Sequence, residues 1–294
     1  MRRGSYWGRL LLFACSIGLG GLLAGAVVMV RATTVKLAHP PRSLHAPDDT
    51  PARLGIAYQD VVLTARDGLR LAAWYTPPRN GRLVLVAHGY AGKRSADTVA
   101  LFARHGYGVL AWDMRAHGES QGALCTFGYA EAGDVETALD FALSQPGVRH
   151  VGAWGESVGG VAAILAGARR PEIEALVVDS AFTSLDDMLA LHTPSPLLQP
   201  LIGFILEQET GASLQAVRPV DQIARLQPRP VFIIQGRADR SIPLDAGRRL
   251  YAAAGEPRVL WEEDGVGHTE MVTARPAEYE RRVAAFFDAA LASR

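Results

Sequence analysis

Three residue types that together can form a nucleophilic catalytic site are present in this chain, each after a short apolar segment. Ser157 lies within the run GESVG, Asp239 follows the apolar residues 231–235, and His268 ends the run GVGH. A serine hydroxyl is a poor nucleophile near neutral pH and needs a base that accepts its proton. His268 could accept that proton, and Asp239 could fix the imidazole tautomer and stabilise the imidazolium. These residue types therefore predict acyl transfer through a covalent serine intermediate.

The glycines around Ser157 indicate how its hydroxyl would become exposed. Apolar residues 148–154 predict a buried strand before the serine, and the alanine-rich residues 161–168 predict a helix after it. A serine at such a strand-to-helix turn forms a nucleophile elbow, in which only small residues fit on either side. We expect a strained backbone at Ser157 and a Val158 amide that points to the developing oxyanion. The alternative is a glycine-rich loop that merely contains a serine.

A second glycine turn offers a partner for the Val158 amide. The run AHGY at 87–90 follows the apolar residues 83–87. An oxyanion hole needs a backbone donor from such a loop, and we assign the amide of Tyr90. Loss of one such donor typically costs about 3–4 kcal/mol of transition-state stabilisation. His88 directly precedes the glycine, so we expect it to order the loop and not to act as the base.

Alternating apolar strands and helical segments must position these residues. Residues 58–63 and 69–75 flank the turn pair Asp67-Gly68 and predict a β-hairpin. Further strands are predicted at 83–87, 108–112, 148–154, 175–178, 231–235 and 258–261, and helices at 98–104, 129–143 and 161–168. Apolar strands separated by helices predict a mostly parallel sheet with helices on both faces. Ligands bind beyond the carboxyl ends of such strands, where the three candidate side chains fall.

A leucine-rich segment at 184–218 interrupts this alternation. Pro194, Pro196 and Pro200 divide it into short pieces. We predict a small helical cap that is inserted between two strands of the sheet. The underside of this cap either lines an acyl pocket or simply packs on the domain, and the sequence leaves both open.

Asp179 is the main rival of Asp239 for the role of the acid, because it also follows a predicted strand. We expect Asp179 to be structural and to fix Ser180 or the start of the cap. The chain order Ser157, Asp239, His268 is the order expected when such a serine follows a central strand.

These motifs resemble the α/β-hydrolase superfamily, in particular its serine esterase, lipase and aminopeptidase-like branch. The likeness covers about residues 58–291 and rests on His88-Gly89, on residues 113–120 (DMRAHGES), on the turn at Ser157, and on the loops of Asp239 and His268. The resemblance implies the α/β-hydrolase fold, with a mostly parallel central sheet, helices on both faces and a small helical cap insertion. It also implies hydrolysis without a cofactor or metal, and a mainly structural role for residues 113–120.

A serine at the elbow, where other members of this fold have an aspartate, implies an acyl-enzyme and hence ester, thioester or amide substrates. We therefore predict a membrane-anchored serine hydrolase that cleaves carboxylic esters, either small-molecule or lipid acyl esters. The alternatives are a serine peptidase or thioesterase with the same three residues, and a catalytically silent binding protein of this fold.

The bulk composition argues against several other classes of partner and chemistry. The 294 residues contain 30 basic and 30 acidic side chains, so the formal net charge is zero. Without a basic cluster in the body of the chain, nothing points to a nucleic-acid partner. Cys15 and Cys125 are the only two cysteines, and they form neither a disulfide framework nor a metal-binding cluster.

The amino-terminal segment predicts a membrane anchor. Residues 10–30 carry no charge and are bounded by Arg9 and Arg31. A helix of this length would extend about 31 Å, which matches the hydrocarbon core of a bilayer. We therefore predict an anchor at 1–31, a linker at 32–54 and a hydrolase domain at 55–294. A cleaved signal peptide is the alternative, although its apolar core usually spans only about 7–15 residues.

The anchor would make this a single-pass protein of the cell membrane. The basic residues on the two sides of the apolar run are nearly balanced in number, so the positive-inside rule decides little. The very short tail before the run favours a cytoplasmic amino terminus and an extracytoplasmic catalytic domain.

Overall fold

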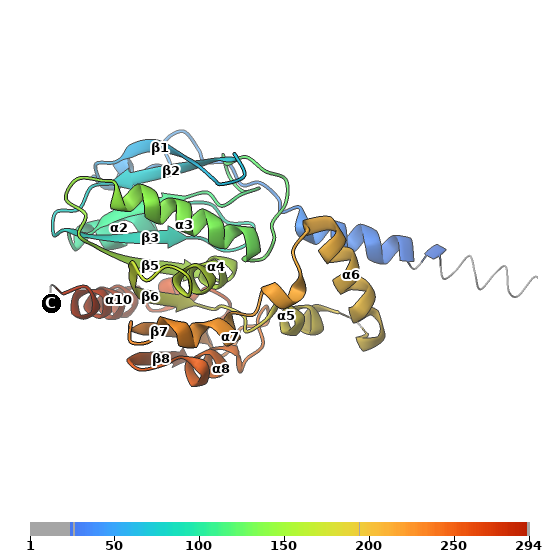
Figure 1. Cartoon of the computed structure of the whole chain (residues 1–294). Helices are drawn as coiled ribbons and strands as arrows, with labels where there is room; N and C mark the ends of the chain where they lie inside the picture. The colour runs from blue at the N-terminus through green and yellow to red at the C-terminus, as the bar shows by residue number, and fades with distance from the viewer. Residues whose placement is uncertain (1–23, 26, 194, 293–294) are drawn as a thin grey trace, which may run out of the picture.

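An eight-stranded sheet forms the centre of the protein in a computed structural model, which describes residues 24, 25, 27–193 and 195–292. The strands are β1 Gln59–Thr64, β2 Arg70–Thr76, β3 Arg82–Ala87, β4 Gly108–Trp112, β5 His150–Glu156, β6 Ile173–Asp179, β7 Val231–Gly236 and β8 Arg258–Glu263. They lie in the order β1-β2-β4-β3-β5-β6-β7-β8 (Figure 1). β2 pairs antiparallel with both β1 and β4, and all other pairs are parallel. The predicted mostly parallel sheet is confirmed.

Helices cover both faces of this sheet. The α-helices are α2 Ala96–Arg104, α3 Tyr129–Leu143, α4 Val158–Gly167, α5 Leu185–His192, α6 Gln199–Thr210, α7 Pro219–Gln222, α8 Ala246–Ala253, α9 Met271–Ala274 and α10 Pro276–Ala290. Their apolar side chains enter two separate buried clusters. One cluster contains Phe102 of α2 and Phe287 of α10, and the other contains Leu139 of α3, Leu165 of α4 and Leu250 of α8. Burial of both faces explains why the central strands are almost continuously apolar.

The hairpin that we predict around Asp67-Gly68 is present as β1 and β2. Gln59 pairs with Tyr75, and Thr64 pairs with Arg70. Gly68 has a φ of +85°, a conformation that glycine adopts without steric cost. The hairpin closes one edge of the sheet, at a distance from the loops that carry the candidate catalytic residues.

The parallel register brings the loops after the central strands to one edge. Ala87 at the end of β3 pairs with Gly155, and Glu156 at the end of β5 pairs with Asp179. On the other side, Gly236 at the end of β7 pairs with Glu263 at the end of β8. Loops that leave these strand ends therefore start side by side, however far apart they are in the sequence.

Helices lie within the segment 184–218, where we predict a helical cap. α5 and α6, with the short 3₁₀ turns η2 Pro196–Leu198 and η3 Leu214–Ala216, lie between β6 and β7 in the chain. They project to one side of the sheet (Figure 1). Leu189 of α5 and Leu206 of α6 are buried in the same cluster as α4, so the cap is packed on the domain.

Residues 27–38 form a helix that projects from the same side as the cap (Figure 1). The segment 32–54, which we predict as a linker, therefore includes helical backbone and also the 3₁₀ turn η1 Pro51–Leu54. Most of the predicted anchor, residues 1–23 and 26, lies outside the described residues. Within the described part of the chain, no helix combines the length and the apolar character that crossing a bilayer requires.

Candidate active site

A single residue, Ser157, separates β5 from α4. Its backbone has φ 51° and ψ −121°, in a region that costs a residue other than glycine about 1–3 kcal/mol. A Cβ at Gly155 would overlap the Gly159 carbonyl, and a Cβ at Gly159 would overlap the Ala87 carbonyl. Both glycines are therefore required by close backbone approach. The helix begins at Val158 and not at the predicted residue 161. Gly159 and Gly160 are therefore helical and not part of a loop.

The three side chains that we single out from the sequence lie together. His268 Nε2 is 3.1 Å from Ser157 Oγ, and His268 Nδ1 is 2.7 Å from Asp239 Oδ2. Ser157 and Asp239 are buried, whereas the side chain of His268 is 26% exposed. In this arrangement Nδ1–H donates to the carboxylate, which leaves the lone pair of Nε2 free to accept the serine proton.

The carboxylate of Asp239 is held by three further donors. The amides of Ser241 and Ile242 donate to its Oδ1 at 2.8 and 3.1 Å, and Gln235 Nε2 donates to its Oδ2 at 3.1 Å. These bonds satisfy both oxygens of a buried group and fix the orientation of the carboxylate towards His268.

Asp179 lies in a different network, and among the described residues it has no hydrogen bond to His268. Its carboxylate accepts from Ser180 Oγ at 2.9 Å and from Tyr279 OH at 3.0 Å. Burial raises the pKa of Asp179 to about 7, although the Ser180 hydroxyl donates to it. Ser180 Oγ in turn accepts from the amide of Thr269 at 3.2 Å. Asp179 thus fixes the backbone beside His268 and does not contact the imidazole.

Tyr90 and Val158 both line the cavity at Ser157. Neither of their amides has a hydrogen-bond partner in the described part of the chain. Val158 is the first residue of α4, where backbone N–H groups have no partner within the helix and favour negative charge. Two free amides beside a serine hydroxyl can act together as donors to an anionic oxygen.

The turn at 88–90 is ordered by the side chains of Glu156, which is partly buried, and His88, which is buried. Glu156 Oε1 accepts from the Gly89 amide at 3.2 Å, and burial raises the pKa of Glu156. His88 Nδ1 donates to the Gly89 carbonyl at 2.7 Å, while its Nε2 accepts from the Met114 amide at 2.9 Å. Burial lowers the pKa of His88 to about 4, which keeps this ring neutral. The His88 ring therefore contacts its own loop, as we expect from the sequence, and among the described residues it has no hydrogen bond to Ser157.

An apolar cavity of about 310 Å³ opens beside Ser157 and His268. Tyr90 and Phe127 line it from the domain, and Met188 and Leu189 of α5 line it from the cap. The underside of the cap therefore forms part of the cavity wall, which decides between the two alternatives that the sequence leaves open. A cavity of this size lies at the lower end of the range for small-molecule sites, about 300–1,000 Å³.

Leu37 and Glu156 line the same cavity, and the sequence patterns did not single them out. Leu37 lies in the helix 27–38, more than a hundred positions before Ser157 in the chain. No local sequence motif indicates that these two residues lie close together. Glu156 is an unspecified position within GESVG, so only the fold reveals its bond to the Gly89 amide.

Residues 113–120 have structural contacts and do not line the cavity. Arg115 forms a paired hydrogen bond with the buried Asp134, at 2.7 Å from each nitrogen, and also contacts Asp67. Arg94 forms an ion pair with Asp113. These contacts connect β4 to the hairpin turn and to α3.

Comparisons with known proteins place the chain in a family and support its fold. Residues 78–210 match the family model described as serine aminopeptidase, S33. The chain is 35% identical over 222 residues to an uncharacterized protein of Mycobacterium tuberculosis, covering 73% of each chain. It is 27% identical over 269 residues to the alpha/beta hydrolase domain-containing protein WAV2 of Arabidopsis thaliana, covering 84% of each.

A solved structure extends the likeness to three dimensions. An esterase of Pyrococcus furiosus superimposes with a TM-score of 0.71 at 26% sequence identity, and the match covers 85% of this chain and 98% of the esterase. The likeness covers most of this chain and nearly all of the esterase, so the two proteins share the overall α/β fold.

Proposed function

Because this chain belongs to the α/β-hydrolase superfamily, we propose that it is a serine hydrolase that cleaves carboxylic esters, including lipid acyl esters, through an acyl-enzyme at Ser157. One observation carries the proposal. The imidazole of His268 lies within hydrogen-bond distance of both Ser157 Oγ and the Asp239 carboxylate, at the wall of an apolar cavity.

In the first half of the proposed reaction, Ser157 Oγ forms a bond to the ester carbonyl carbon while its proton passes to His268 Nε2. The carbonyl electron pair moves onto the oxygen, where the amides of Tyr90 and Val158 would stabilise the negative charge. Asp239 stabilises the imidazolium without taking up its proton. When the electron pair returns, the ester C–O bond breaks and the departing alkoxide takes the proton from His268.

In the second half, water attacks the acyl-enzyme and gives one proton to His268. The second oxyanion collapses with cleavage of the bond to Ser157 Oγ, which takes back the proton as the acid leaves. His268 therefore alternates between base and acid, and the partly exposed side chain gives it access to the water.

The cavity favours esters over peptides. Its walls are largely apolar, as an acyl chain requires, and Glu156 is the one acidic side chain among the described residues that line it. An aminopeptidase needs a carboxylate that pairs with the substrate ammonium group, but the carboxylate of Glu156 already accepts from the Gly89 amide at 3.2 Å. A peptidase is the second candidate, because the matched family model is described as serine aminopeptidase.

We further propose that residues 10–30 anchor the enzyme in the cell membrane, with the catalytic domain on the extracytoplasmic side. Val28 and Met29, at the end of the apolar run, are each 67% exposed on a helix that projects from the domain. Such side chains are suited to lipid and not to water.

Labelling of Asp48→Cys tests the orientation. The new thiol should react with a membrane-impermeant reagent in intact cells; reaction only after permeabilisation would reverse the orientation.

Covalent labelling with a fluorophosphonate probe tests the hydrolase proposal. We expect the folded protein to be labelled, and Ser157→Ala to lose the label while it retains its circular dichroism spectrum. A folded wild-type protein that stays unlabelled would instead support a catalytically silent binding protein. A series of acyl esters and matched aminoacyl amides then separates esterase from peptidase by kcat/KM.

A further inference from the structure

The helix 27–38 links the apolar amino-terminal run directly to the cavity. Leu37, on its last turn, lines the cavity together with Ser157 and His268. The hydroxyl of Tyr90, whose amide we assign to the oxyanion hole, donates to the Leu37 carbonyl at 3.0 Å. The end of this helix is therefore part of the rim of the candidate active site.

The helical segment between Val30 and Leu37 sets the distance between the apolar run and the cavity. Val30 ends the run, and the helix continues without interruption to Leu37. Seven residues at 1.5 Å each correspond to about 10 Å along the helix axis. The headgroup layer on each side of a bilayer is about 5–8 Å thick, because the whole bilayer is about 40–45 Å and its core about 30 Å. A run inserted to Val30 would place the rim of the cavity at the outer edge of the headgroups.

The contacts after the helix prevent the domain from moving away on a loose tether. The Cys125 amide donates to the Ala38 carbonyl at 2.8 Å, and His39 Nε2 lies 3.0 Å from Glu209 Oε1 of α6. Arg42 then donates to the carbonyls of Gly118, Ser120 and Gly122 at 3.0, 2.5 and 2.5 Å. The helix is thus fixed both to the domain and to the cap.

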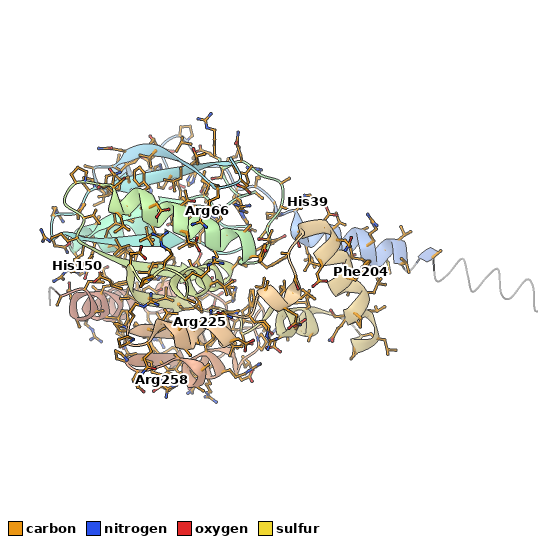
Figure 2. The ribbon with its side chains drawn as sticks, in the orientation of Figure 1. His39, Arg66, His150, Phe204, Arg225 and Arg258 are labelled. Carbon is orange, nitrogen blue, oxygen red and sulfur yellow. The ribbon has the colours of Figure 1, made fainter. Side chains whose placement is uncertain are left out.

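The cap carries apolar side chains on the same side of the molecule as this helix. Leu197 of η2 is 90% exposed and Phe204 of α6 is 59% exposed. Figure 2 shows Phe204 on α6, the helix that His39 contacts through Glu209. Arg31 and Lys36 are exposed on that helix, where basic groups would meet lipid headgroups. Exposed apolar groups next to basic ones are typical of a surface that lies on a membrane.

We propose that the helix 27–38, together with Leu197 and Phe204 of the cap, seats the mouth of the cavity on the lipid bilayer, so that acyl substrates enter from the membrane. The proposal rests on the proposed ester hydrolase and gives its substrate class: acyl esters that reside in or on the bilayer. We choose a lipid surface as the occupant because the rim of the cavity at Leu37 lies about 10 Å along the helix axis from the end of the uncharged run 10–30.

Depth-dependent quenching tests the docking without reference to activity. The full-length protein carries Cys15→Ser and either Leu197→Cys or Phe204→Cys, labelled with the fluorophore NBD, in vesicles of phosphatidylethanolamine and phosphatidylglycerol. Cys125 is buried and stays unlabelled. Val62→Cys is the matched control, because Val62 is 52% exposed on the edge strand β1.

Spin-labelled lipid should quench NBD at 197 and at 204 about twofold or more above the level at 62, as expected for side chains at the lipid interface. Quenching equal to that at 62 would overturn the proposal. A label at 197 or 204 that is shielded from water yet unaffected by the lipid quencher would indicate a second copy or another protein on this surface, and would also overturn it.

Substrate delivery gives a second, independent measurement. Leu197→Ser and Phe204→Ser should each lower the ratio of vesicle-borne to water-soluble ester hydrolysis about tenfold, the size of effect expected from losing one buried apolar side chain. Val62→Ser should leave that ratio unchanged. Equal losses on both substrates would contradict the proposal. Failure of the hydrolase proposal itself appears separately, as absence of fluorophosphonate labelling at Ser157 while the lipid quenching at 197 and 204 persists.

Discussion

The strained turn at Ser157 requires glycine, which has no Cβ, at the neighbouring position Gly159. Ser157 has a positive φ, and Gly159 lies so close to the Ala87 carbonyl that no Cβ fits between them. The side chain of Ser157 and the start of α4 are therefore fixed by one close contact between the first turn of the helix and the end of β3. Strain of this kind persists only where the surrounding structure over-determines it.

Gly159→Ala should lower the free energy of unfolding by about 1–3 kcal/mol, because the new methyl group overpacks this contact. Urea denaturation measures the change, and fluorophosphonate labelling should slow in parallel. Gly133→Ala in α3 is the matched control, since its Cβ would meet nothing within 4 Å. There the better helix propensity of alanine should raise stability by up to about 1 kcal/mol. Equal effects at both positions would contradict this account of the turn.

Asp239 and Asp179 can be separated by parallel substitution with asparagine. Asp239→Asn should reduce kcat on a soluble ester by about 10⁴-fold, because the amide would favour the wrong imidazole tautomer. Asp179→Asn should reduce it far less, since Asp179 contacts Ser180 and Tyr279 and not His268. Circular dichroism establishes that both variants fold. The reverse ranking of the two losses would assign the acid to Asp179.

At the scale of elements, one buried hydroxyl connects α10 to two central strands. Tyr279 OH accepts from Trp154 Nε1 of β5 at 2.8 Å and donates to Asp179 at the end of β6. The carboxyl-terminal helix therefore supports the strand ends that carry Ser157 and Ser180. The sequence offered no signal for this connection, because an amphipathic helix with a tyrosine on its buried face is common.

Tyr279→Phe should destabilise the fold by about 1–3 kcal/mol, because it leaves the buried indole N–H of Trp154 without a partner and removes one of the two hydroxyl donors to the buried Asp179 carboxylate. Chemical denaturation measures this loss. Tyr107→Phe removes a comparable hydroxyl, which donates to Asp288 at 2.6 Å, but the Asp288 side chain is 54% exposed. Water can replace that bond, so the control should cost about 1 kcal/mol or less. If Tyr107→Phe lowered the free energy of unfolding as much as Tyr279→Phe, burial of the partner groups would not explain the loss of stability.

At the scale of the whole molecule, Asp179 makes stability depend on pH. The pKa of Asp179 is raised by burial to about 7 in the folded protein, against an ordinary value of 3.8. Between these values the folded state binds more protons than the unfolded state, so the contribution of Asp179 to stability falls as the pH rises from about 4 to 7. Below that window it is protonated in both states.

Asp179→Asn removes this titration and keeps a group of similar shape. Denaturation at a series of pH values should show the stability of the variant, relative to wild type, increasing steadily from about pH 4 to pH 7. A difference that stays constant across this range would mean that Asp179 does not titrate there. Lys93, Asp49 and other paired surface groups are unchanged in both proteins and cancel in the comparison.

Much of the fold could be predicted because its signals are local. Short apolar segments such as 83–87 and the pair Asp67-Gly68 gave strands and a hairpin close to those of β3, β1 and β2. Boundaries were less accurate where glycine suggested a loop, as at Gly159 and Gly160, because tertiary contact overrides the low helix propensity of glycine.

The sequence by itself determined the candidate nucleophile, its glycine turn, the chain order of the candidate serine, acid and histidine, and a parallel sheet, since each depends on residue types at short spacing. Only the tertiary structure decided that Asp239 and not Asp179 contacts His268, that the cap lines the cavity, and that Leu37 reaches its rim. Each of these contacts depends on the distance between segments that are far apart in the chain. Strand order, register and packing set such distances, and no local sequence pattern encodes them.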